Sequence, residues 1–196
     1  MVYAPETDHI PRGSRGGLPL PDDYTERPPL AEASRAQLLY TLQLRRALND
    51  DPEFLKELER SLESDITDTR TEFGGYIVFA PDGSAQLLQT YSYSESDGAF
   101  FGGDAEDIPP GLSFHFHALT DNNAADGYAG PSGSLGGGGD IGYAEARRAV
   151  NVVFTTAGRT ENERLSFNTD TFAVNRLPNG DRTAVVIALG SDAFEH

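Results

Sequence analysis

The spacing of apolar residues changes from helical to strand-like near Glu72, and this change constrains the fold more than any other feature. Between residues 31 and 48, leucines recur at close to helical spacing. Asp51 can then cap a second helix, which has Pro52 at its first position and an apolar stripe behind it. The sequence therefore predicts a helical segment over residues 31–65 that precedes everything else.

The segments after residue 72 are rich in aromatic and β-branched residues and are separated by turn residues. An alanine-rich stretch, 141–149, predicts one short helix among them, and Asp140 is well placed to cap it. Helices followed by a mostly antiparallel or mixed sheet with one inserted helix indicate an α+β domain. We expect strands at 73–80, 85–93, 112–118, 150–156, 165–167, 171–176 and 183–189.

Residues 1–30 are rich in proline, glycine and charge, and they cannot bury enough apolar surface to offset the cost of ordering. We predict that this segment is disordered or draped over the domain. A chain of 196 residues fits one domain with an extension. The predicted organisation is therefore an N-terminal segment (1–30), a helical extension (31–65) and one folded domain (66–196).

The formal net charge of −16 argues against a nucleic-acid backbone or an anionic membrane as partner, and it favours a basic protein surface. No apolar run approaches the roughly 20 residues needed to span a bilayer. The N-terminus also lacks the layout of a secretory signal. We expect a cytoplasmic protein, or one delivered by a secretion system without a classical signal peptide.

His115 and His117 form the strongest chemical signal in the chain. They are separated by one residue within a strand-like segment, so both imidazoles should face the same side of a sheet. The other two histidines, His9 and His196, lie near the ends of the sequence. Because the chain has no cysteine, histidine and carboxylate are its only strong metal donors. Two imidazoles and one carboxylate make a usual catalytic zinc set, with a fourth position open for water.

The carboxylate that would complete this set is not fixed by the histidines themselves. Asp121 and Asp126 are nearer in sequence, whereas Asp140 follows a glycine-rich loop. Each of these residues also has a simpler structural explanation. The histidine pair can be part of the sheet packing, Asp140 can be a helix cap, and Glu72 can be a solvated charge at a strand edge. Nucleotide binding is excluded as the role of the four-glycine run, since no Lys-Ser/Thr follows it.

The order Glu72, His115-x-His117, Asp140 resembles the JAMM/MPN+ (JAB-domain) zinc metalloproteases over roughly residues 70–190. The resemblance implies a JAB/MPN-like, cytidine-deaminase-like catalytic domain. It implies that the two histidines and Asp140 bind zinc. Glu72 would take a proton from the metal-bound water. We prefer Asp140 to the two other aspartates because the alanine-rich segment behind it resembles the helix of that family.

Two positions depart from the family pattern. Gly137 stands where the family usually has a serine that helps to hold the oxyanion, and Ala118 stands where a proline commonly follows the second histidine. Losing one oxyanion donor can cost about 10²–10³ in rate. Ser132, Ser134 or a backbone amide of the glycine run could supply the missing donor.

The resemblance implies a zinc-dependent peptidase or isopeptidase of the bacterial JAB-like branch. Such an enzyme would hydrolyse an amide bond in a peptide or protein, including one that joins a ubiquitin-like tail to lysine. The loop 119–139 would then gate the substrate. The alternatives are a catalytically impaired JAB-like module that binds a protein partner, as in bacterial effector or toxin systems, and a metal site that only stabilises the fold.

Overall fold

The computed structural model describes residues 33–68, 72–93, 111–117, 130–159 and 165–189. This part of the chain is an α+β structure with three helices and a six-stranded mixed sheet, which confirms the predicted fold class. The N-terminal segment 1–30, Asp121 and Asp126 lie outside the described residues. The elements are α1 (Arg35–Asp50), α2 (Pro52–Thr67), β1 (Glu72–Phe79), β2 (Ala85–Tyr93), β3 (Gly111–His117), α3 (Gly139–Arg147), β4 (Asn151–Arg159), β5 (Leu165–Arg176) and β6 (Arg182–Ala188).

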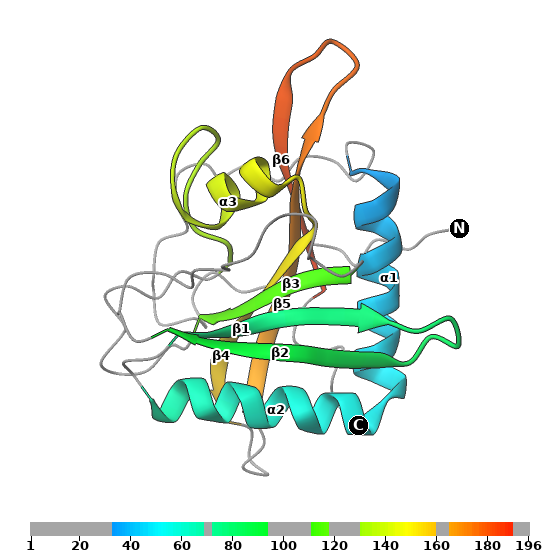
Figure 1. Ribbon diagram of the computed structural model, residues 1–196, viewed down its shortest axis with the longest axis vertical. Helices are drawn as coiled ribbons and strands as arrows, with labels where there is room; N and C mark the ends of the chain where they lie inside the picture. Colours follow the sequence, from blue (N-terminus) through cyan, green and yellow to red (C-terminus); the bar gives the residue numbers. More distant parts are fainter. Residues whose placement is uncertain (1–32, 69–71, 94–110, 118–129, 160–164, 190–196) are drawn as a thin grey trace.

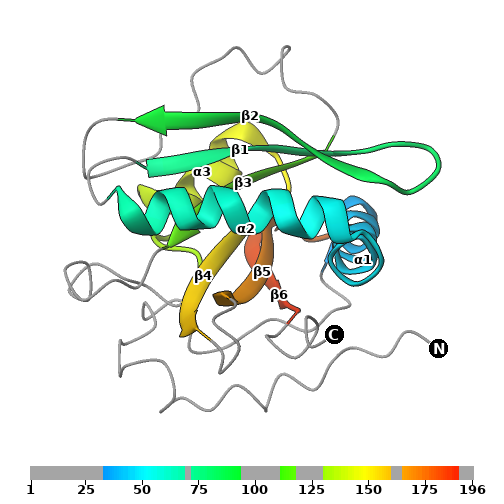
Figure 2. The same ribbon diagram turned by 90° about the horizontal axis from the view of Figure 1, so that it is seen from below.

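The strands lie in the order β2-β1-β3-β4-β5-β6. All neighbours are antiparallel except β3 and β4, which run parallel. Parallel neighbours cannot be joined by a tight turn, so the chain must cross over between them. This crossover carries α3, which lies on the opposite side of the sheet from α1 and α2 (Figures 1 and 2).

The two N-terminal helices begin at side-chain caps. Ser34 accepts a hydrogen bond from the Gln37 amide at 3.1 Å, and Asp51 accepts one from the Phe54 amide at 3.1 Å. Pro52 occupies the first turn of α2, where its missing N–H costs nothing. The predicted start of α2 is therefore confirmed. No helix in the described ranges is long and apolar enough to cross a membrane.

Helix α1 turns a partly polar side toward the sheet. Gln37 is buried and donates to the Val185 carbonyl at 2.8 Å, and Thr41 shares a hydrogen bond of 2.7 Å with Thr171. Leu39 and Leu42 are instead about half exposed, at 53% and 51%. The leucine spacing predicted the helix but not the whole of its buried face.

Two predicted strand segments, 165–167 and 171–176, form the single strand β5. The polar residues between them, Asn168, Thr169 and Asp170, are buried rather than in a turn. They continue the strand because β4 and β6 pair with it on both sides. The sheet context thus overrides the low strand preference of this polar stretch.

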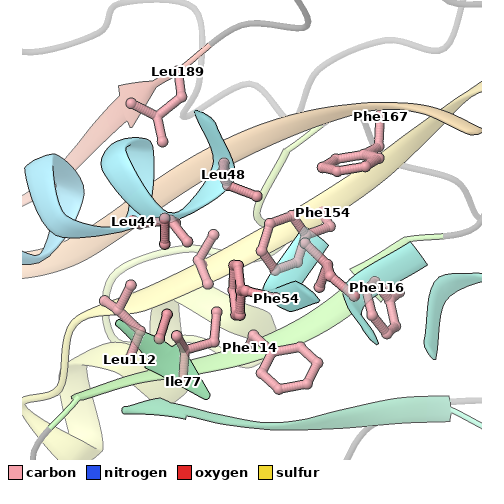
Figure 3. Packing of buried hydrophobic residues seen from close by; sticks show 14 of the residues in the cluster. Leu44, Leu48, Phe54, Ile77, Leu112, Phe114, Phe116, Phe154, Phe167 and Leu189 are labelled. Carbon is pink, nitrogen blue, oxygen red and sulfur yellow. The ribbon is translucent and has the colours of Figure 1, made fainter. Parts of the chain in front are cut away.

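The main core fills the space between the sheet and the helices α1 and α2. Phe114, Phe116 and Phe154 are buried in it together with Leu44 from α1 and Phe54 from α2 (Figure 3). A smaller cluster on the other face joins α3 to β4, β5 and β6 through Ile141, Ala144, Val153, Phe172 and Val186. Because side chains alternate along a strand, the odd-numbered His115 and His117 face this second side. The N-terminal helices therefore lie on the face opposite the histidines.

Candidate metal centre

The histidine pair lies near the middle of the sheet. His115 is buried, at 6% exposure, and its ring meets the Phe172 ring edge-on with centroids 6.5 Å apart. Its register partners are Gly74 on β1 and Val153 on β4. Since Gly74 has no side chain, no bulky group stands beside His115 at that β1 position.

Asp140 comes from the first turn of α3 and meets both histidines. Its Oδ1 lies 3.0 Å from His115 Nε2, and its Oδ2 lies 3.5 Å from His117 Nε2. The two Nε2 atoms are 3.3 Å apart. The structure thus brings together His115, His117 and Asp140, and within the described part of the chain they form the group able to hold a metal ion.

The donor spacing fits a zinc ion. Zinc–nitrogen bonds are about 2.0–2.1 Å long, so two donors at tetrahedral angles lie about 3.3 Å apart. The two Nε2 atoms are separated by this distance, and each has one oxygen of Asp140 nearby, Oδ1 at 3.0 Å from His115 and Oδ2 at 3.5 Å from His117. The donor set, two neutral imidazoles and a carboxylate, is also one that zinc prefers. Other divalent ions that accept imidazole, such as Ni²⁺ and Cu²⁺, share this preference, so the donors fit a metal without naming it.

Ser132 holds the Asp140 carboxylate from the side away from His115. Its backbone amide donates to Asp140 Oδ2 at 2.6 Å, and its hydroxyl donates to the same oxygen at 2.9 Å. The Ser132 carbonyl accepts from the Ile141 amide at 3.0 Å, which ties the serine to the start of α3. Asp140 is therefore fixed by its own loop as well as by the histidines.

The Asp140 carboxyl stays ionised to lower pH than an ordinary aspartate. Burial by itself would raise its pKa, but the charge and hydrogen bond of His115, the charge of His117 and the Ser132 amide together outweigh burial. The net effect lowers the pKa below the ordinary value of 3.8. A metal would therefore meet a carboxylate that is already deprotonated at neutral pH.

The predicted helix cap at Asp140 is wrong in detail. Helix α3 begins at Gly139 and its N-cap is Gly138, so Asp140 lies inside the first turn. Its carboxylate is turned toward Ser132 and the histidines and makes no side-chain cap. The helix itself ends at Arg147, two residues before the predicted end.

The glycine run before α3 is a compact turn. The Gly136 amide donates to Glu145 Oε2 at 2.6 Å, and the Gly137 amide donates to the Ser134 carbonyl at 3.0 Å. Arg182 of β6 also donates to Glu145. The predicted gating loop, 119–139, is described only from residue 130 onward, and this part is ordered by hydrogen bonds. Gating remains a prediction for the rest of the loop.

The two candidate serines have different surroundings. Ser132 is committed to Asp140, as given above. Ser134 Oγ lies 2.7 Å from the point where a Cβ on Gly137 would stand. The hydroxyl of Ser134 thus fills the space next to the position at which the family resemblance leads us to expect a serine. Sequence spacing gave no signal for the contact between Ser132 and Asp140, because these residues are eight positions apart in an irregular loop.

Glu72 is the first residue of β1, and its register partner in β2 is Tyr93. Gly74 follows Glu72 by two positions, and its register partner on β3 is His115. The Glu72 side chain lies outside the described part of the structure, so its role stays a prediction.

No protein-family model matches the chain, and neither the curated proteins nor the solved structures contain a match to it. The residues of this site and the motif that they form are therefore the basis for inferring its function.

Proposed function

We propose that this protein is a zinc-dependent peptidase or isopeptidase of JAB type. The observation that carries the proposal is the convergence of His115, His117 and Asp140, whose donor atoms lie within 4.8 Å of one another. These are the three residues that the motif resemblance assigns to zinc. Their donors come from a strand and from a helix 23 positions later (140 − 117 = 23), so folding alone brings them together.

The three residues would hold zinc and leave one position open, as in other catalytic sites with three protein ligands. Bound zinc lowers the pKa of its water to about 7 and polarises a carbonyl oxygen. Asp140 contributes the negative charge of the site, and the histidines contribute neutral nitrogens. Phe172 packs against His115 and shields that side of the site from water.

Glu72 would act as the proton carrier. It would first accept a proton from the attacking water and then deliver it to the departing amine, a role worth about 10²–10⁴ in rate. Its place at the start of β1, two positions from the register partner of His115, supports this assignment. Ser134, which fills the space beside Gly137, is our candidate for the oxyanion donor that position 137 lacks.

Two variants test the proposal on the full chain. Zinc content is measured after purification, and hydrolysis is measured on peptides and on ubiquitin-like tails linked to lysine. We expect Glu72→Gln to retain zinc and lose at least 10²-fold in rate. We expect His117→Ala to lose both zinc and activity. His9→Gln, which alters a histidine distant in sequence from the motif, is the control for nonspecific effects of histidine loss.

Three results would count against the proposal. Purified protein that takes up no zinc would remove its basis. Unchanged hydrolysis in Glu72→Gln would remove the assigned proton carrier. If parent protein and His117→Ala both captured a protein partner equally well and neither cleaved any substrate, the chain would be a binding module instead.

A further inference from the structure

We propose that Ser132 is a positioning residue that makes Asp140 bind the metal through one oxygen, Oδ1, and so keeps the fourth coordination position open. This inference rests on the metal site of the proposed function. It adds a residue that the motif does not include, and it concerns how many oxygens the carboxylate can offer.

The two oxygens of Asp140 have different surroundings. Oδ2 accepts two hydrogen bonds from Ser132, at 2.6 Å from the amide and at 2.9 Å from the hydroxyl. A carboxylate oxygen has about two lone-pair sites, so these two donors fill the capacity of Oδ2. Oδ1 is instead the atom nearest to His115 Nε2, at 3.0 Å. Oδ2 also lies 3.5 Å from His117 Nε2, but its two hydrogen bonds to Ser132 occupy it. The oxygen that remains available is thus Oδ1, which faces His115.

Ser132 can hold the carboxylate because its own position is fixed. A Cβ on Gly139 would stand 2.9 Å from the Ser132 hydroxyl, so a glycine is needed there for the chain to approach so closely. The Gly130 amide, two residues before Ser132, donates to Thr155 Oγ1 at 3.3 Å. Thr155 is the register partner of His117 on the neighbouring strand. The serine is therefore connected to the same sheet that carries the histidines.

The number of bound oxygens decides whether the site has room for a water molecule. With two imidazoles and one carboxylate oxygen, a tetrahedral zinc has one open position. If Asp140 turned and bound through both oxygens, that position would be occupied. Partners that orient a metal ligand in this way typically change metal affinity or activity by about 10–100-fold.

The Ser132 hydroxyl has a single proton, and that proton is donated to Oδ2. It is therefore not available to an oxyanion on a substrate. This separates the roles of the two neighbouring serines, since Ser132 orients the carboxylate and only Ser134 remains for a substrate.

The experiment compares Ser132→Thr with Ser132→Val in the full chain. These two residues have nearly the same shape, but only threonine keeps the hydroxyl. Zinc affinity is measured by competition with a chelator, and the visible absorption of the Co²⁺-loaded protein reports the coordination number. Ser64→Ala, which removes a hydroxyl on the exposed side of α2, is the matched control. Melting of each metal-free variant shows that it is folded.

We expect Ser132→Val to bind zinc about 10–100-fold more weakly than Ser132→Thr. Its cobalt bands should weaken, as they do when a four-coordinate ion gains a ligand. Ser132→Thr and Ser64→Ala should resemble the parent protein. If parent protein binds zinc and the threonine and valine variants give equal affinities and spectra, the role of Ser132 is overturned while the proposed function stands. A parent protein that binds no zinc overturns both.

Discussion

The charge of Asp140 depends on its neighbours, and this makes the stability of the protein sensitive to acid. The pKa of this carboxyl is below 3.8 in the folded protein because His115, His117 and Ser132 favour the ionised form over the effect of burial. A group whose pKa is lowered by folding stabilises the protein above its unfolded pKa, and this contribution is lost as the pH falls through the lower, folded pKa.

Replacing Asp140 with asparagine should remove this contribution. In metal-free protein with a chelator present, we expect Asp140→Asn to unfold more easily than the parent at pH 6, with the difference shrinking as the pH falls below about 4. Urea unfolding across this pH range measures it. Asp50→Asn, at an exposed position of α1, is the control for replacing an aspartate with asparagine. A difference that stays constant down to pH 3 would contradict this linkage.

At the level of single residues, the sequence predicted the histidines more securely than their carboxylate partner. Strand alternation alone puts His115 and His117 on one face. Asp140 was preferred over Asp121 and Asp126 only through a resemblance, since an irregular loop has no periodicity from which to predict where it returns. The contact from Ser132 is a property of that same loop path, and the sequence could not predict it.

The start of α2 gives a prediction at the scale of an element. Asp51 accepts from the Phe54 amide at 3.1 Å and so satisfies one of the free donors of the first turn. We expect Asp51→Ala to lower the free energy of unfolding by about 0.5–2 kcal/mol. Asp50→Ala, one residue earlier and in an exposed pair with Arg46, should change it by less than about 0.5 kcal/mol. Chemical denaturation followed by circular dichroism compares the two, and equal effects would argue against the cap.

Helix α3 contains a glycine for which the usual helix rule should reverse. Replacing a mid-helix glycine with alanine normally stabilises by about 0.5–1 kcal/mol. At Gly142, however, a Cβ would stand 2.1 Å from the Gly137 carbonyl oxygen, which is backbone and cannot easily move. We expect Gly142→Ala to destabilise by about 1–3 kcal/mol, as overpacking does, and to weaken zinc binding by displacing the turn before Asp140.

Gly138 is the matched control for that variant. It has a φ of −94° and nothing within 4 Å of its Cβ position, so alanine can be accommodated there. Its cost should stay at or below about 1 kcal/mol, the usual penalty of alanine at an N-cap. If thermal melting showed Gly142→Ala to be the more stable of the two, the close approach of the glycine turn to α3 would be refuted.

Elements were predictable wherever local chemistry was unambiguous. Asp51-Pro52 marks a helix start, and the strands β1 and β2 were predicted to within one residue at each end. The continuity of β5 was not predictable, because Asn168 and Asp170 are poor strand formers and the strand continues through them where β4 and β6 pair with it. The buried face of α1 could not be predicted from the sequence for a similar reason. Gln37 can be buried because it donates to the Val185 carbonyl and accepts from the Asn175 side chain.

At the scale of the whole molecule, the two N-terminal helices and the sheet share one core. Phe154 is fully buried in it, with the rings of Phe114, Phe116 and Phe167 at centroid distances of 6.2, 5.8 and 5.7 Å. We expect Phe154→Ala to cost about 3–5 kcal/mol. Leu39→Ala, at a half-exposed position of α1, should change the free energy of unfolding by about 0.5 kcal/mol or less.

Urea unfolding followed by both fluorescence and circular dichroism measures these two variants. Because helices and strands contribute to the same cluster, both probes should give one coincident transition in each protein. Separate transitions for the helices and the sheet would show that α1 and α2 form a unit of their own.

The parallel pairing of β3 with β4 has a consequence for how the site comes into being. His115 and His117 belong to β3, and Asp140 belongs to the crossover that connects β3 to β4. A metal ion bound by all three residues would connect this crossover to the sheet. Its binding would therefore require β3 and the crossover to be in their final arrangement. Binding by all three residues therefore requires the crossover to be complete, whereas an incompletely folded chain offers the ion only the two neighbouring histidines.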